Sequence, residues 1–295
     1  MTDLTTTTDA EGALDPAGQV AKPTIPLPGG YIYGVTRYAD VILERAFPGR
    51  FTDLVAALDA FHPTLDEIRS AGGSRTPFVA RFDASLAQLT VDGERAWGKQ
   101  NITIEKQIGL AGDAHIQSRV RGHEIDMFGI KSKDAPFPGI AVEMEWNNKD
   151  PFFDRDLVNF QALHHEGAIA VGVIVTRGPQ LQNLIKPLIT SKDGNLKYGE
   201  SSTHWQKLVP RVNLGGGGEC PLLLVGIEPS RIDGVELAHE AHEKISHADR
   251  VLTGWRELKA KGEIRDYRHA QAVAKALRDE ARALLPPVAS VEDDL

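Results

Sequence analysis

Three acidic residues, Asp126, Glu143 and Glu145, lie in two short segments whose apolar and polar residues alternate, residues 123–128 and 139–146. Because successive side chains of a β-strand point to opposite faces, we expect Glu143 and Glu145 to share one face, about 7 Å apart. Neighbouring strands lie roughly 5 Å apart, so Asp126 on the preceding strand can join them. Three carboxylates that meet in this way repel one another unless a divalent cation lies between them, and such oxygen ligands suit Mg²⁺. The opposite face of the second strand is apolar: Val142, Met144 and Trp146.

A carboxylate site of this kind is suited to the hydrolysis of phosphodiesters. One or two Mg²⁺ ions hold the phosphate, activate the attacking water and stabilise the leaving oxygen. Two alternatives stay open on spacing alone. The paired glutamates can belong to a solvated strand face, or they can serve a sugar hydrolase. The second alternative is weaker, because acid and base normally approach a sugar from opposite sides.

The segment after Glu145 supports a substrate site at the end of this strand. Residues 146–156 read WNNKDPFFDRD and lead directly into a helical pattern, with Asp154 as a candidate N-cap. The turn-rich part supplies hydrogen-bond donors and acceptors of the kind that read base edges or phosphates. We therefore expect four residues of this loop to contact DNA: Asn147, Asn148, Lys149 and Asp150.

The elements that must position these residues follow an α/β order. Residues 35–89 show apolar positions at helical spacing and are punctuated into three or four helices, and no strand is expected before about residue 101. The middle of the chain alternates strands with a helix over 154–166, as in a crossover unit. Long helical stretches close the chain. The expected strands are 101–108, 115–120, 123–128, 139–146, 168–176 and 221–228, and the expected later helices are 181–188, 203–212, 235–260 and 264–285.

Composition sets the outer limits of this interpretation. The 295 residues include 33 basic and 41 acidic side chains, for a net charge of −8, but each end of the chain contributes −3, so the body is nearly neutral. A basic DNA-binding groove is compatible with that balance. We expect a disordered leader over 1–30, a single domain over 31–285 with its core at 100–230, and an acidic tail over 286–295.

Several other motifs are given their simpler interpretations. The lone Cys220 excludes an intramolecular disulfide, so a cytoplasmic location is expected, and no apolar stretch is long enough to span a membrane. The run Gly215–Gly218 lacks the Lys-Ser/Thr of a phosphate-binding loop, so no nucleotide cofactor is expected. His239 and His242 lie three residues apart on a helix without a matching third ligand, which favours a solvated face over a zinc site.

Two runs of the sequence resemble the BglII-type restriction endonucleases. They are VEMEWNNKDPFFDRDLVNFQALHHEGAIAVGVIVTR, residues 142–177, and STHWQKLVPRVNLGGGGECPLLLVGI, residues 202–227. The resemblance covers about residues 120–230. It implies a PD-(D/E)XK nuclease core, a central mixed sheet with flanking helices, to which this chain adds helices at both ends. It also implies a homodimer that cuts palindromic double-stranded DNA with Mg²⁺ and leaves 5′-phosphate ends.

The resemblance assigns roles to individual residues. Asp126 and Glu143 correspond to the two acidic positions that bind Mg²⁺, for which Mn²⁺ is expected to substitute. Glu145 stands where the wider superfamily has lysine, which is similar to the BamHI branch, and it would orient or deprotonate the water. Glu105 is a candidate fourth carboxylate, and His204 a candidate DNA contact. The missing lysine also leaves open a protein that binds DNA on this core without cutting it.

Overall fold

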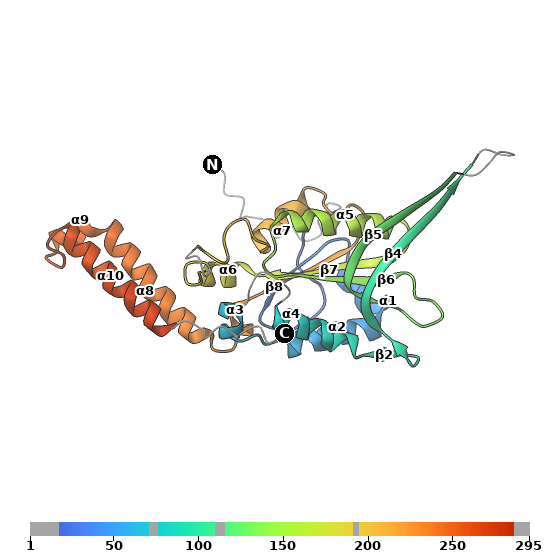
Figure 1. Ribbon diagram of the computed structural model, residues 1–295, viewed down its shortest axis with the longest axis horizontal. Helices are drawn as coiled ribbons and strands as arrows, with labels where there is room; N and C mark the ends of the chain where they lie inside the picture. Colours follow the sequence, from blue (N-terminus) through green and yellow to red (C-terminus); the bar gives the residue numbers. More distant parts are fainter. Residues whose placement is uncertain (1–17, 71–75, 110–115, 191–194, 286–295) are drawn as a thin grey trace, which may run out of the picture.

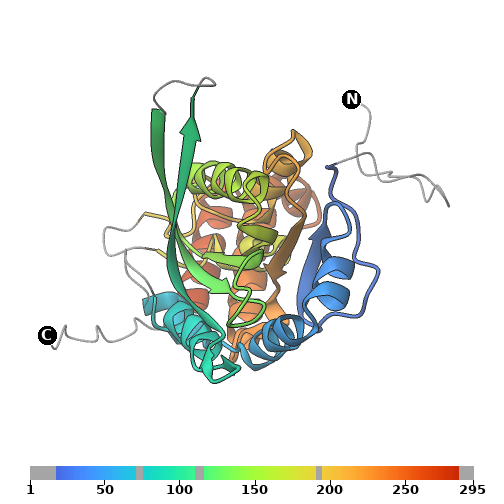
Figure 2. The ribbon, with the colours of Figure 1, turned by 90° about the vertical axis from the view of Figure 1, so that its right-hand side faces the viewer.

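The computed structural model describes residues 18–70, 76–109, 116–190 and 195–285, and a six-stranded sheet forms its centre (Figures 1 and 2). The strand order across this sheet is β1-β8-β7-β6-β5-β4, and a separate pair, β2 with β3, lies beside it. This mixed sheet with flanking helices confirms the expected fold class. The strands are β1 Tyr31–Val35, β2 Thr90–Val91, β3 Glu94–Arg95, β4 Trp97–Ile108, β5 Ile116–Gly129, β6 Gly139–Glu145, β7 Ile169–Arg177 and β8 Leu222–Ile227.

The three middle strands of the sheet, β6, β7 and β8, are parallel, and the outer pairs are antiparallel. Helix α5, Pro151–His165, makes the crossover between β6 and β7, as the sequence indicates. In the register of the sheet, Glu145 lies opposite Thr176, which in turn lies opposite Gly226. The carboxyl ends of the three parallel strands therefore meet at one edge, where ligands of open α/β sheets normally bind.

Helices cover both faces of the sheet (Figure 1). On one face, α1 to α4 pack against the apolar side of β6, and Val142, Met144 and Trp146 are buried there as expected. On the other face, Phe153 and Phe160 of α5 pack against β7 and β8 together with α7. The helices of these layers are α1 Ala39–Ala46, α2 Pro48–Ala60, α3 Leu65–Ser70, α4 Pro77–Ala87, α6 Pro179–Ile185 and α7 Trp205–Asn213.

The C-terminal helices form an arm that projects from the body (Figure 1). After β8 the chain makes a short 3-10 turn, η1 Pro229–Arg231, and then runs outward along α8, Val235–Thr253. Helix α9, Trp255–Ala260, lies at the tip, and α10, Tyr267–Leu284, returns. The arm has a small apolar core of its own, around Val251, Ile264 and Ala270. In the described residues, no helix is long and apolar enough to cross a membrane.

The N-terminal part differs from the expectations in two respects. A strand, β1, precedes residue 101, so the prediction of no earlier strand is wrong; its sequence YIYGV is rich in residues that favour strands. Residues 18–30 lie against the body instead of forming part of a free leader. The backbone of Ala21 pairs with Val35, and the amide of Thr24 donates to the Asp40 carboxylate at 2.6 Å. Residues 1–17 and the expected tail, 286–295, lie outside the described residues.

The remaining differences concern element boundaries. The two strands expected at 115–120 and 123–128 form one strand, β5, which pairs with β4 as a long hairpin (Figure 2). Helix α5 begins at Pro151, one turn earlier than expected. Asp154 therefore lies in the first turn of the helix and not at its N-cap. Proline at a first helical position is favourable, because its missing N–H would have no helical partner there.

Candidate active site

The two glutamates of β6 are buried on the sheet face covered by α5. Glu143 and Glu145 are each only 3% exposed, although they stand near the end of the strand. They share a face, as the alternation predicts, and the apolar side chains between them face the other way. The neighbouring strand β7 secures the position of Glu145, because the Thr176 hydroxyl donates to the Glu145 carbonyl at 2.7 Å.

Asp126 on β5 comes directly beside Glu143. The pairing of Met127 with Val142 sets this register, and the Asp126 amide lies 3.4 Å from Oε1 of Glu143. The structure therefore brings together the three acids that the sequence analysis selected. Asp126 is half-buried, so this corner of the cluster is the one open to solvent.

Helix α5 adds a fourth acid, which the sequence analysis missed. Asp156 is buried, and it shares the guanidinium of Arg155 with Glu145: Arg155 Nη2 lies 2.6 Å from Asp156 Oδ1 and 3.2 Å from Glu145 Oε1. A signal for Asp156 was present in the sequence. The apolar stripe of α5 contains Phe153 and Phe160, and an acid three residues from the first and four from the second lies on that stripe.

Burial and mutual repulsion shift the acids of this cluster toward their neutral forms. Burial, followed by the charges of Asp126 and Asp156, raises the pKa of Glu143 well above its usual range. Burial raises the pKa of Glu145 to about 8, although the amide of Asn148 opposes this shift. Burial also raises the pKa of Asp156, against the lowering effect of Arg155. The cluster thus holds more negative charge than Arg155 alone can balance.

The expected DNA-binding loop follows β6 and is held by a second loop, residues 199–204. The Asn148 carbonyl accepts from the Thr203 amide at 2.9 Å, and the Asp150 amide donates to the Ser201 carbonyl at 2.9 Å. The side chain of Asn148 turns toward the acids and donates to Glu145 Oε2 at 2.6 Å. The loop is therefore joined both to the carboxylate cluster and to the second of the two sequence runs.

The expected DNA contacts are not equally free to bind DNA. Asn148 and Lys149 are exposed, and Asn147 is half-buried. Asp150 is already engaged, because Arg211 of α7 donates to it at 3.2 Å. His204 is buried at the start of α7, where its Nδ1 lies 2.8 Å from Gln206 Oε1.

Glu105 lies apart from the cluster. It projects from the outer part of the β4–β5 hairpin, opposite Arg119, and pairs with that residue at 3.2 Å. Asp126 is seven residues along β5 from Arg119, which corresponds to roughly 20 Å of strand. The structure therefore does not support Glu105 as the fourth carboxylate, and Asp156 occupies that position in the cluster.

The donor set of the cluster suits a hard divalent cation. Within the residues described, no three Asp, Glu, His or Cys side chains are already grouped as a metal cage, and Arg155 pairs with the oxygens on the α5 side. Two features nevertheless fit a metal. Glu143 has no ion pair in the described part of the chain, and Oδ2 of Asp156 is buried without a hydrogen-bond partner. Carboxylate oxygens left uncompensated in this way are the ligands that Mg²⁺ prefers.

Comparison with known proteins adds an independent finding. A family model described as restriction endonuclease BglII/BglIII matches residues 31–227. The match contains the whole central sheet and every acid of the cluster, and it ends with β8, before the arm. No curated protein sequence matches the chain.

Proposed function

The chain belongs to the BglII/BglIII family of restriction endonucleases, and from this premise we propose how it cuts DNA. The family is one of type II enzymes that cleave double-stranded DNA at specific sites. We propose that this protein hydrolyses phosphodiester bonds of a palindromic sequence with Mg²⁺ as cofactor and leaves 5′-phosphate ends. Mn²⁺ is expected to substitute for Mg²⁺.

The observation that carries this proposal is the buried acid cluster at the carboxyl edge of the sheet. The cluster holds four carboxylates from β5, β6 and α5, but Arg155 pairs only with Glu145 and Asp156. At least two of the four are held where their charged forms are disfavoured. Such an arrangement weakens a protein unless a ligand offsets it. A divalent cation would supply the positive charge that these carboxylates lack. It would also bind a DNA phosphate, as cleavage by this family requires.

We assign the following roles to the chain's own residues. Asp126 and Glu143 would hold the metal ion, which when bound supplies charge to the phosphate and lowers the pKa of water. Glu145, whose pKa of about 8 lies close to neutral pH, would orient the attacking water and accept its proton. Arg155 is a positioning residue for Glu145 and Asp156, and Asn148 steadies Glu145 from the loop side.

A homodimer follows from the symmetry of a palindromic target. Each subunit would read one half-site, and the two active sites would cut opposite strands. Asn147, Asn148 and Lys149, at the open end of β6, are our candidates for base or phosphate contacts. Sedimentation of the purified protein, alone and with duplex DNA, tests this part of the proposal, and a monomer on DNA would contradict it.

The test of the proposed activity is digestion of phage DNA with Mg²⁺, with Mn²⁺ and with EDTA, followed by electrophoresis. Discrete bands in both metal lanes and intact DNA with EDTA are expected. End-labelling would then show whether the 5′ ends carry phosphate. Cutting that persists in EDTA would refute the metal requirement.

A second candidate function is DNA binding without cleavage. The observation that favours it is the glutamate at position 145, where the superfamily has lysine, together with the guanidinium that already occupies this carboxylate. A bandshift on duplex DNA without nicking, under both metal ions, would support this candidate over the first.

A further inference from the structure

We propose that the tip of the C-terminal arm binds the phosphate backbone of DNA beside the target site. This inference rests on the proposed function, because it takes duplex DNA as the ligand. It concerns a part of the chain that lies outside the family match, which ends at residue 227. The binding site consists of residues 250–268, the outer ends of α8 and α10 with α9 between them.

The charge of this segment is opposite to that of the whole chain. Residues 250–268 carry six basic and three acidic side chains, a net charge of +3, whereas the chain carries −8. All six basic side chains are exposed, and none makes an ion pair in the part of the chain that the structure describes. These residues are Arg250, Arg256, Lys259, Lys261, Arg265 and Arg268.

The inner part of the same arm is different. There the cations are matched across the two helices: Lys244 lies 2.8 Å from Glu280, and Arg278 lies 2.7 Å from Asp249. At the tip, Asp266 is within reach of cations but serves as the N-cap of α10, accepting from the His269 amide at 2.8 Å. Cations left without partners in the protein are available for an anionic partner, and regularly spaced phosphates are the ligand of the proposed enzyme.

The arm begins on the side of the molecule where DNA would bind. It leaves the sheet from the carboxyl end of β8, and Gly226 of β8 lies two strands across from Glu145 in the register, or about 10 Å. Helix α8 has 19 residues and is therefore about 28 Å long. That length corresponds to about eight base pairs of duplex, so the tip can reach phosphates beyond a short target.

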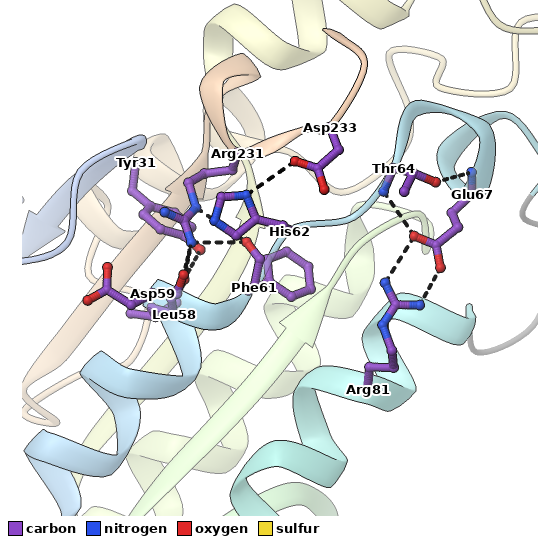
Figure 3. Close-up of polar contacts among 10 residues, drawn as sticks. All are labelled: Tyr31, Leu58, Asp59, Phe61, His62, Thr64, Glu67, Arg81, Arg231 and Asp233. Atoms are coloured by element: carbon purple, nitrogen blue, oxygen red, sulfur yellow. Dashed lines mark hydrogen bonds and ion pairs between the residues drawn. The ribbon is translucent and has the colours of Figure 1, made fainter.

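Several hydrogen bonds join the base of the arm to the end of α2 and the loop after it (Figure 3). The guanidinium of Arg231, at the end of η1, donates to the carbonyls of Leu58, Asp59 and Phe61 at 2.5–3.3 Å and lies over the ring of Tyr31. Leu58 and Asp59 belong to the last turn of α2 and Phe61 is its C-cap. Carbonyls at the C-terminal end of a helix are good acceptors for a cation, because the helix dipole is negative there.

A backbone connection and a capped helix reinforce this base. The Asp233 amide donates to the Pro63 carbonyl at 3.0 Å, and the Leu65 amide donates to the Asp233 carbonyl at 2.9 Å. Thr64 and Glu67 cap α3 reciprocally, and Glu67 also binds Arg81 of α4 (Figure 3). The arm therefore extends from a densely hydrogen-bonded part of the body and not from a linker.

The test is a salt titration of DNA binding, with Lys259→Gln, Lys261→Gln and Arg265→Gln combined in the full-length chain. Binding to a 40-base-pair duplex pool of random sequence is measured by fluorescence anisotropy in Mg²⁺, between 50 and 200 mM salt. Each lost phosphate contact reduces the slope of log Kd against log salt by about 0.9, so we expect a reduction of roughly 3. On a 14-base-pair pool, the variant and the wild type should differ by less than one unit of slope.

The matched control removes the same charge from the inner arm, with Lys244→Gln, Arg278→Gln and Arg282→Gln. These cations are paired within the arm, so the slope should change little. Cleavage of phage DNA at low salt should be the same for the tip variant and the wild type.

Two outcomes would overturn the inference. One is an unchanged slope of the tip variant on the long duplex. The other is a change of its oligomeric state in sedimentation, which would make the tip a contact between subunits. A wild-type protein that neither binds nor cuts duplex DNA would instead refute the proposed function, and with it the premise of this inference.

Discussion

The carboxylate cluster and the base of the arm both contain buried charged side chains, but these charges are paired to different extents. At the base, Arg231 is surrounded by helix carbonyls and an aromatic ring, and Glu67 has both a cap and Arg81 as partners. In the cluster of four acids, Arg155 pairs with Glu145 and Asp156, and in the described part of the chain Glu143 has no ion pair. Complete pairing is found where the arm joins the body, and incomplete pairing is found in the region that we propose to bind a ligand.

The sharpest way to test this contrast is to remove a ligand-facing acid. Glu143→Ala is expected to abolish cutting. The loss of rate should exceed the roughly 10–100-fold that is typical when a residue that only hydrogen-bonds to a metal ligand is removed. DNA binding should persist. Initial rates on plasmid DNA with Mg²⁺ measure this effect.

Glu105→Ala is the paired control, because Glu105 lies on the outer hairpin with Arg119 as its partner. It should cut like the wild type. Equal rates for the two variants would contradict the assignment of the site.

Replacing Arg231 at the base of the arm should lower the stability of the protein and leave the rate of cutting unchanged. Arg231→Met removes the guanidinium that donates to the carbonyls of Asp59 and Phe61 and to that of Leu58, which keeps the Tyr31 hydroxyl as a donor. The change is expected to lower the free energy of unfolding by about 3 kcal/mol. Urea denaturation measures the loss. Arg282→Met, which breaks an exposed pair with Asp279, should cost less than about 1 kcal/mol.

The two regions should also respond oppositely when a charge is neutralised in the metal-free protein. Glu143→Gln keeps the shape of the side chain and fixes it in a neutral form, which removes repulsion from Asp126 and Asp156 wherever the wild-type carboxyl is ionised. In EDTA it should therefore stabilise the protein by about 1–2 kcal/mol at a pH above the raised pKa of Glu143. Added Mg²⁺ should stabilise the wild type more than this variant. A variant that melts at a lower temperature than the wild type in EDTA would show that the charge of Glu143 does not destabilise the metal-free protein.

A pH dependence of stability is expected near the base of the arm. Glu228 accepts from the Leu181 amide at 3.1 Å, and burial raises its pKa to about 7 from an ordinary 4.5. Its contribution to stability is therefore fully present below pH 4.5 and is lost as the pH rises through 7. The slope in that window should stay below about 1.4 kcal/mol per pH unit. Melting curves of Glu228→Gln should lack this contribution, and an identical pH profile would contradict it.

The sequence predicted the parts of the site that depend on local periodicity. Alternation along β6 placed Glu143 and Glu145 on one face, and the short return from β5 brought Asp126 beside them. Asp156 was missed because its position depends on how α5 packs over the sheet. Glu105 was misplaced because alternation gives the face of a strand but not the distance along a long hairpin.

The fold followed a similar pattern. The parallel centre and the helical layers were predictable from apolar runs and punctuation. Strand β1 was not, because a five-residue segment between Gly30 and a helical region takes its structure from pairing with β8, which is nearly two hundred residues away. The direction of the arm could not be predicted from the sequence either, because it depends on the hydrogen bond of Arg231 to the end of α2.

The side chain of Asn148 has one further consequence. Its amide donates to Glu145, while the backbone carbonyl of Asn148 accepts from the Thr203 amide. The loop that we propose to contact DNA and the carboxylate that we propose to handle the water are therefore joined. A wrong base pair that displaces this loop would also displace Glu145. Errors would then be discriminated twice, first in affinity and again in the rate of the chemical step, which is a basis for fidelity in an enzyme that must spare near-cognate sites.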